Sequence, residues 1–213
     1  TETSPLAAIA RPSATAPPER AQEMRTTQGR PVCGVQMRLV ADDGSVLPHD
    51  GQAVGELEVR GPWVTGAYYQ GADDDKFHDG WLRTGDVGRI DADGFLTLTD
   101  RAKDVIKSGG EWISSVQLEN ILTGHPAVFE AAVIGVPDPK WQERPLAAVV
   151  LQDGLHIAPQ EIKSWLAQQV PRWWLPEQWT FIEQVPRTSV GKFDKKLLRA
   201  YHADGKLSIT TVR

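Results

Sequence analysis

The sequence predicts an α+β protein, in which a small β-rich, barrel-like subdomain precedes a compact α/β domain. Over residues 35–99, short runs of alternating apolar and polar residues are separated by glycines, which is typical of strands joined by tight turns. After Asp100, apolar runs alternate with segments of helical periodicity. We therefore expect one domain over residues 1–99 and a second over residues 100–213.

The strands expected in the first part follow from its alternation. Residues 35–40 and 56–61 alternate between apolar and polar side chains. Residues 87–90 and 95–99 flank the run Asp-Ala-Asp-Gly, which favours a tight hairpin turn. Together these segments predict a small antiparallel sheet or a barrel-like module.

The N-terminal region has a different composition. Residues 1–30 show little periodicity, and the segment 11–20 is rich in Pro, Ala and Ser. This composition favours a surface loop or a partly disordered connector. We therefore expect residues 11–30 to be a loop.

The second part carries helix and strand signals in alternation. Ser114 precedes an apolar-periodic run and Gln117 lies three residues later, which is the pattern of an N-terminal capping box. Residues 127–137 and 145–152 are apolar enough to be buried strands, and Pro159 suits the first turn of a second helix. We also expect a strand over residues 178–185 and a short helix over residues 194–201.

Composition excludes several classes of protein. The chain has 213 residues and a formal net charge of −5, which disfavours a general nucleic-acid binder because such proteins carry a basic face. The single cysteine, Cys33, excludes an internal disulfide framework, and the five histidines show no metal-ligand spacing. No apolar run approaches the roughly 20 residues of a membrane helix, and no secretory signal is recognisable. We expect a cytoplasmic protein without a transition metal.

The run Arg-Thr-Gly-Asp at residues 83–86 is a polar turn before the expected hairpin. A carboxylate at Asp86 could accept hydrogen bonds from the two hydroxyls of a ribose, as an acidic residue does in other nucleotide sites. The alternative is an aspartate that only completes a β-turn.

Two further segments combine cations with glycines. Residues 100–112 contain three cations, three acids and the pair Gly109-Gly110, whose backbone could approach a ligand closely. The alternative is a solvated, charged turn. In residues 186–199, Lys192 directly follows a glycine, and a lysine on a flexible turn can neutralise charge on phosphate or carboxylate oxygens. The alternative is one more exposed lysine.

The order and spacing of these motifs resemble the second half of an adenylate-forming enzyme. The runs are, in chain order, TETSP, GELEVRG, RTGD, DRAKDVIKSGGEWIS and PRTSVGK. This superfamily comprises acyl-CoA synthetases, peptide-synthetase adenylation domains and firefly luciferase. The run IKSGGEWISSVQLEN is most similar to AMP-forming medium- and long-chain fatty acyl-CoA synthetases. The resemblance covers nearly the whole chain apart from residues 11–20 and the last few residues.

The resemblance implies a nucleotide site. Thr1 would contact the nucleotide phosphate, and Glu2 would support Mg²⁺. Asp86 would hold the ribose hydroxyls, and Arg101 would reach the ribose and phosphate region. Lys192 would be the catalytic lysine, which enters the site only for adenylation.

The resemblance also implies a mobile C-terminal domain that rotates between two orientations, with its hinge at Asp100 and Lys103. In the thioester-forming orientation, one loop would face the nucleotide site and help to line the pantetheine tunnel. The residues of this loop are Ser108, Gly109, Gly110, Glu111 and Trp112.

By this resemblance, the chain is the C-terminal part of a fatty acid–CoA ligase, which converts a carboxylic acid and ATP to acyl-AMP and transfers the acyl group to CoA. ATP, Mg²⁺ and CoA are implied, and the N-terminal part of the same enzyme is an implied partner, since the chain begins with Thr1. No Thr/Ser/Gly-rich phosphate loop followed by Lys occurs in the sequence, so we expect the isolated chain to be weakly active or inactive. Two alternatives remain open: an acyl-adenylating domain that loads a carrier protein, and a non-catalytic binding module derived from the fold.

Overall fold

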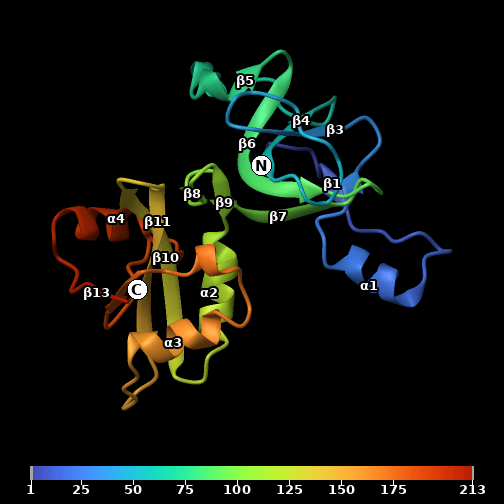
Figure 1. Cartoon of the computed structure of the whole chain (residues 1–213). Helices are drawn as coiled ribbons and strands as arrows, with labels where there is room; N and C mark the ends of the chain where they lie inside the picture. Colours follow the sequence, from blue (N-terminus) through green and yellow to red (C-terminus); the bar gives the residue numbers. More distant parts are fainter. Residues whose placement is uncertain (1, 213) are drawn as a thin grey trace. The chain divides into compact units, whose positions relative to one another are not determined.

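A computed structural model describes residues 2–212, which divide into two compact units between Lys103 and Asp104 (Figure 1). The sequence predicted the change of domain near Asp100. In the part of the chain that the structure describes, no helix combines the length and the apolar character that a membrane crossing requires.

The first unit is built mostly of strands. Its elements are β1 (Ala8–Ile9), α1 (Pro18–Arg25), β2 (Arg30–Pro31), β3 (Gln36–Val40), β4 (Gly55–Arg60), two short 3-10 turns (Tyr69–Gly71 and Asp74–Lys76), β5 (Phe77–His78), β6 (Trp81–Ile90) and β7 (Leu96–Arg101). The expected strands over residues 35–40 and 56–61 are confirmed as β3 and β4. The expected hairpin is confirmed as β6 and β7, with Ile90 opposite Leu96.

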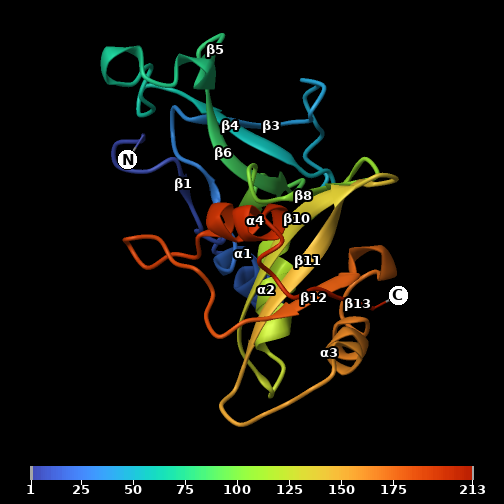
Figure 2. The same cartoon turned by 90° about the vertical axis from the view of Figure 1, so that its left-hand side faces the viewer.

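These strands form an antiparallel sheet in the order β3-β4-β6-β5 (Figure 2). The strand β7 also pairs with β6. Alternate residues of the strands point to one face and form a common apolar core, because successive side chains of a strand point to opposite faces. The buried members of this core are Leu39, Leu57, Val59, Leu82, Ile90 and Leu96.

The expectation of a barrel-like module is wrong. Among residues 2–212, no pairing joins β3 back to β5 or β7, so the sheet stays open. A barrel requires every strand to have two hydrogen-bonded neighbours. Alternation of side chains is common to open and closed sheets, and therefore does not distinguish them.

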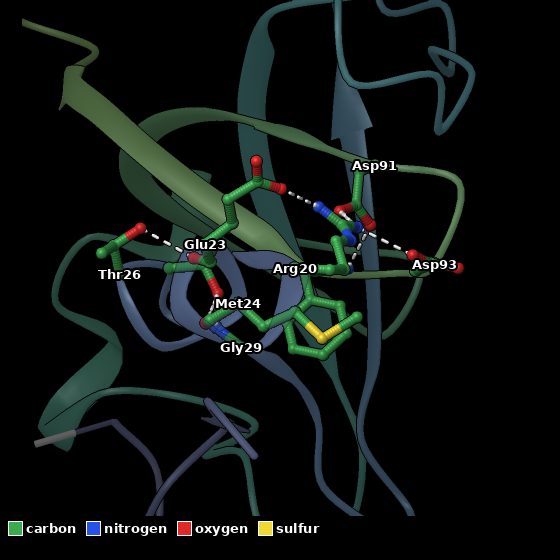
Figure 3. Close-up of polar contacts among 9 residues, drawn as sticks. Arg20, Glu23, Met24, Thr26, Gly29, Asp91 and Asp93 are labelled. Carbon is green, nitrogen blue, oxygen red and sulfur yellow. Dashed lines mark hydrogen bonds and ion pairs between the residues drawn. The ribbon is translucent and has the colours of Figure 1, made fainter. Parts of the chain in front are cut away.

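The expectation that residues 11–30 form a loop is also wrong, because this segment contains the helix α1. Pro18 occupies the first helical position, which suits its fixed φ. Ala21 and Met24 are buried on the inner face of the helix. Arg20 donates to Asp91 Oδ2 at 2.6 Å and to Asp93 Oδ2 at 2.7 Å, which attaches α1 to the turn between β6 and β7 (Figure 3). Residues far apart in the sequence therefore stabilise this helix.

The second unit contains helices and strands in alternation. Its elements are β8 (Ile106–Ser108), β9 (Glu111–Ile113), α2 (Ser115–Thr123), β10 (Val128–Asp138), β11 (Gln142–Leu151), α3 (Pro159–Leu166), a 3-10 turn (Arg172–Trp174), β12 (Gln178–Phe181), α4 (Lys195–Ala203) and β13 (Thr210–Thr211). The strand expected over residues 178–185 is shorter than predicted and ends at Phe181.

The strands of the second unit form one sheet in the order β13-β12-β11-β8-β9, in which β10 also pairs with β11. The long antiparallel hairpin of β10 and β11 is its centre, and α2 and α4 lie on opposite sides of this hairpin (Figure 1). Ala131 and Val133 of β10 pack with α2 and α3, whereas Ala132 and Ile134 pack with α4. The hairpin is therefore buried on both faces, which explains its nearly continuous apolar sequence.

Two predicted helix starts are confirmed. Ser114 is the N-cap of α2, and its side chain accepts a hydrogen bond from the Gln117 backbone N–H. Asp194 caps α4 in the same way, accepting from the Leu197 N–H at 2.9 Å. Each cap satisfies a backbone donor that has no partner within its helix.

Candidate active site

Asp86 and Arg101 lie opposite each other on the paired strands β6 and β7. Arg101 Nη1 and Asp86 Oδ1 are 2.9 Å apart and form an ion pair. The backbone N–H of Asp86 donates to Thr84 Oγ1 at 3.1 Å, and the Thr84 hydroxyl donates to the Leu57 carbonyl at 2.8 Å. The pairing of the strands thus brings together two of the residues that the sequence predicted for a nucleotide site.

A cavity of about 440 Å³ opens beside this ion pair, and we refer to it as the Asp86 cavity. Its lining combines apolar side chains of the sheet with acidic, hydroxyl and amide groups. A site of this kind can hold a ligand that has one flat apolar face and several hydroxyls. The lining residues are Glu2, Thr3, Ala7, Ala8, Gln28, Met37, Leu57, Val59, Tyr68, Leu82, Thr84, Asp86, Leu96, Leu98 and Arg101.

The electrostatic environment of Asp86 is unfavourable for its charged form. Burial raises the pKa of Asp86 above its ordinary value, and the negative charge of Glu2 raises it further, while the positive charge of Arg101 opposes the rise. The cavity therefore holds a partly desolvated acceptor, which would gain from hydrogen-bond donors on a ligand.

Glu2 lies in the same cavity and is held by Tyr68. The Tyr68 hydroxyl donates to Glu2 Oε1 at 3.1 Å, and the Thr65 N–H donates to the Glu2 carbonyl at 2.9 Å. A hydrogen bond from its own backbone and the one from Tyr68 lower the pKa of Glu2. Burial and the contact with Glu2 raise the pKa of Tyr68. Sequence analysis missed Tyr68, because an aromatic residue in a glycine-rich run carries no signal of its own.

The donor set of this cavity fits Mg²⁺. Magnesium prefers oxygen ligands, and nucleotide sites usually supply one or two carboxylates while the substrate phosphates and water supply the rest. Glu2 offers such a carboxylate, and the charge of Asp86 is close enough to couple with it. Thr1, the other residue predicted to act at the phosphates, lies outside the described residues.

The predicted hinge residues lie at the end of the first unit. Asp100 is buried, and its Oδ1 accepts a hydrogen bond from the Arg101 N–H at 2.7 Å. Lys103 is the last residue before the division between the units. The Ala102 N–H donates to the Gly85 carbonyl, so the backbone between the two predicted hinge residues is anchored to β6.

The predicted loop over residues 108–112 is the tip of the hairpin of β8 and β9. Ser108 pairs with Glu111, and Gly109 and Gly110 have φ values of +61° and +87°. A two-residue hairpin turn with positive φ at both positions favours glycine, which explains the Gly-Gly pair locally. We refer to residues 107–112 as the glycine turn.

A second cavity, of about 340 Å³, lies beside the glycine turn. It is lined by Ser108, Gly109, Glu111, Trp141, Arg144 and Trp173. Trp112 is not among these residues; its ring lies next to Lys107, whose ammonium is 5.2 Å from the ring centroid. Sequence analysis missed Trp141, Arg144 and Trp173 at this site, because all three lie far from the glycine turn along the chain.

Lys192 lies in the second unit, on an exposed loop before α4. The loop is closed by a bridge between Arg187 and Phe193 and by a hydrogen bond from the Thr188 N–H to the Lys192 carbonyl at 2.8 Å. Gly191 adopts a φ of +82°, which lets the chain turn immediately before the lysine. The structure thus presents Lys192 at a loop tip, as the sequence predicted.

Two family models match the chain. The AMP-binding enzyme family matches residues 1–69, and the AMP-binding enzyme C-terminal domain matches residues 117–192. Lys192 is the last residue of the second match, whereas Asp86, Arg101 and the glycine turn lie between the two.

Curated relatives agree with these matches. The chain is 46% identical to 3-methylmercaptopropionyl-CoA ligase of Ruegeria pomeroyi, over 95% of this chain and 38% of the relative. It is 44% identical to a medium-chain-fatty-acid–CoA ligase of Ectopseudomonas oleovorans, over 88% of this chain and 34% of the relative. It is 47% identical to a long-chain-fatty-acid–CoA ligase of Thermus thermophilus, over 83% of this chain and 33% of the relative. The chain thus spans about a third of the length of these relatives.

Solved structures share its fold. The o-succinylbenzoate CoA synthetase of Bacillus subtilis, in complex with its acyl-adenylate intermediate, matches with a TM-score of 0.73 and 32% identity, over 86% of this chain and 37% of that one. ATP-bound MatB of Rhodopseudomonas palustris matches with a TM-score of 0.72 and 31% identity, over 84% of this chain and 36% of that one. The chain therefore belongs to the AMP-binding enzyme family, and it is homologous to the C-terminal portion of AMP-forming acid–CoA ligases.

Proposed function

We propose that the chain is the C-terminal part of a fatty acid–CoA ligase, which converts a carboxylic acid and ATP to acyl-AMP and pyrophosphate, and then transfers the acyl group to CoA. The observation that carries this proposal is the grouping of Glu2, Asp86 and Arg101 around one cavity. Three residues that the family resemblance assigns to the nucleotide and its Mg²⁺ line one cavity, although 84 positions separate Glu2 from Asp86 in the sequence.

In the first half-reaction, a carboxylate oxygen of the acid attacks the α-phosphorus of ATP and pyrophosphate leaves. Asp86 would accept hydrogen bonds from the ribose hydroxyls, and its partly desolvated carboxylate makes these bonds stronger than they would be in water. Arg101, whose side chain is more than half exposed, would turn from Asp86 toward the ribose and phosphate region. Mg²⁺ held at Glu2 would offset the charge of the phosphate oxygens.

Lys192 would supply a positioned ammonium during the same half-reaction. Negative charge accumulates around the α-phosphorus as the acid attacks, and a positioned cation stabilises that charge. The exposed loop tip that carries Lys192 supports this role, because its side chain is not occupied in the packing of the second unit.

In the second half-reaction, the thiol of CoA attacks the acyl carbon and AMP leaves. A lysine beside the α-phosphate would obstruct the thiol, so the second unit would rotate about Asp100 and Lys103 and present the glycine turn instead. The position of both residues next to the division between the units supports a hinge there.

The acyl substrate proposed here is a fatty acid. Relatives named for medium-chain and long-chain fatty acids support this choice, and a relative named for 3-methylmercaptopropionate extends the range to a short thioether acid. The chain lacks a phosphate loop followed by Lys, so we propose that the reaction requires an upstream portion of the enzyme.

Pyrophosphate release tests this function. The chain would be assayed alone and after extension at its N-terminus with the upstream portion of a relative, using fatty acids of several lengths and 3-methylmercaptopropionate. We expect activity only in the extended form, and a loss of about 10²- to 10³-fold in its Lys192→Ala variant, because one preorganised charge is removed. Lys196→Ala, at the next exposed lysine of the same region, serves as the matched control.

The acceptor is tested separately with free CoA and with a holo carrier protein. If the acyl group were transferred to the carrier protein and not to free CoA, the chain would belong to a carrier-loading enzyme rather than a CoA ligase. If the extended form released no pyrophosphate with any of the acids, the proposed activity would be contradicted and a non-catalytic binding module would be favoured.

A further inference from the structure

Trp141 and the first residues of β11 hold the glycine turn by several independent contacts. The Gly109 N–H donates to the Trp141 carbonyl, and the Lys107 N–H donates to Glu143 Oε2, both at 2.9 Å. Ser108 pairs with Gln142, which adopts a φ of +72°, a strained conformation for a residue other than glycine. Strain of this kind persists only where the surrounding structure maintains it.

Arg144 adds a side-chain brace to these backbone contacts. Its side chain is buried, and Nη1 donates to Ser108 Oγ at 3.2 Å and to the Trp173 carbonyl at 2.6 Å. Nη2 donates to the Leu175 carbonyl at 3.1 Å. One guanidinium thus joins the glycine turn to the segment over residues 173–175, which follows Arg144 by about 30 positions along the chain.

The charge of Arg144 is poorly compensated for a buried group. Its ion-pair partner within the described residues is the half-exposed Glu177, whose carboxylate oxygen lies 3.7 Å from Nη2. Within the described residues, Arg144 Nε has no hydrogen-bond partner. Burial of a charge without close compensation costs free energy, so a methionine of similar volume would satisfy the packing at least as well. Arg144 therefore combines an unfavourable cost of burial with three hydrogen bonds that hold the local geometry.

The geometry that Arg144 determines is that of the second cavity. Ser108, Gly109 and Trp173 all line this cavity. The indole of Trp141 packs against Gly109 so closely that a Cβ at this glycine would lie 2.8 Å from the ring. A shift of the brace would therefore move the turn and the cavity wall together.

We propose that Arg144 is a positioning residue for the thiol-transfer half-reaction, acting through the Ser108 hydroxyl and the Trp173 carbonyl. This inference rests on the proposed function, because it requires the glycine turn to face the acyl-adenylate during transfer. Adenylation takes place with the Lys192 loop at the site, so it does not require the glycine turn in this position. The two half-reactions should respond differently to loss of the brace.

The test measures both half-reactions in the N-terminally extended enzyme. ATP–pyrophosphate exchange reports adenylation, and single-turnover transfer from preformed acyl-AMP to CoA reports the second step. For Arg144→Met we expect exchange within about twofold of the parent and transfer lowered by about 10- to 100-fold in rate, since a displacement of about 1 Å has such effects. Arg172→Met, an exposed arginine of the same 3-10 turn as Trp173, is the matched control.

Two further variants separate geometry from folding and from charge. Ser108→Ala removes one acceptor and leaves Arg144 in place, so it should lower transfer in the same direction even where Arg144→Met does not fold. Arg144→Lys keeps the charge but cannot reach the three acceptors together, so its transfer rate should stay close to that of Arg144→Met. Full recovery with lysine would overturn the proposal in favour of charge alone.

An equal loss of exchange and transfer, or no loss of either, would also overturn the proposal. Absence of exchange in the parent would instead contradict the proposed function. In that case, amide hydrogen exchange of the 213-residue chain tests the positioning role of Arg144. Arg144→Met should increase the exchange rates of the Lys107 and Gly109 amides. Unchanged protection of both amides would remove the positioning role.

Discussion

Asp86 lowers the stability of the folded chain but provides a hydrogen-bond acceptor for a ligand in the Asp86 cavity. Its carboxylate lies on β6 opposite Arg101, in a region where burial raises its pKa. A desolvated acceptor costs free energy in the empty cavity and gains it when a ligand donates hydrogen bonds. Residues of this kind are expected at sites that bind, rather than in the structural core.

Asp86→Asn should therefore stabilise the chain at neutral pH relative to the parent. Because the folded pKa is raised, the stability that this group contributes is present at low pH and is lost as pH rises through the folded value. The advantage of the Asn variant should thus grow between about pH 3 and about pH 7. Urea unfolding at several pH values measures it, with the exposed Asp153→Asn as a control. An advantage that shrinks with rising pH would contradict this assignment.

At the scale of elements, the helices differ in where their stability originates. The start of α2 was predictable, because the cap joins Ser114 to Gln117, only three positions further along the sequence. The helix α1 was not predictable, because its anchors at Asp91 and Asp93 lie about 70 positions away in the chain. A helix of eight residues is not stable alone in water and depends on such contacts.

Ser114→Ala should lower the free energy of unfolding of the second unit by about 1 kcal/mol, because the Gln117 N–H loses its cap. Urea unfolding followed by amide exchange in α2 measures this. Ser164→Ala in α3 is a suitable control, since its hydroxyl only donates back to the Gln160 carbonyl of the same helix. Equal effects of both changes would show that the cap contributes nothing specific.

Arg20→Met should increase amide exchange in α1 several-fold without changing exchange in the second unit (Figure 3). Partial burial raises the pKa of Asp91, but hydrogen bonds from the Phe95 N–H and from Arg20 outweigh this, and the net pKa is lowered. The attachment of α1 is therefore present above the ordinary pKa of aspartate and should weaken as pH falls through the folded value. Arg25→Met, at an exposed position of the same helix, should leave exchange unchanged.

At the scale of the whole molecule, each unit has a core of its own. The first unit is organised around the apolar cluster that contains Leu57 and Ile90. The second unit has two clusters, one on each face of the hairpin of β10 and β11, and the fully buried Trp179 belongs to one of them. Units with separate cores can fold and move separately, which is what a two-orientation mechanism requires.

Residues 104–213 should fold as an independent domain with one cooperative unfolding transition. A fragment that begins at residue 117, where the C-terminal family match starts, should fold poorly, because it loses β8 and β9 and with them the buried Ile106 and Ile113. Proton–nitrogen NMR spectra and urea unfolding of both fragments check this. A dispersed spectrum from the shorter fragment and none from the longer one would refute it.

The sequence by itself determined the features that depend on near neighbours. These include the β6–β7 hairpin, the capped start of α2, the Gly-Gly turn and the residue types of the proposed nucleotide site. Periodicity, caps and turn residues act over a few positions, so a single sequence displays them directly.

Only the tertiary structure decided the features that depend on distant segments. It attached α1 to the turn between β6 and β7, left the first sheet open, placed Tyr68 against Glu2, and directed Arg144 at the glycine turn. In each case the partners meet because sheets and cores bring remote residues together, and the free energy that selects them comes from burial and hydrogen bonding across the fold. No local pattern carries that information.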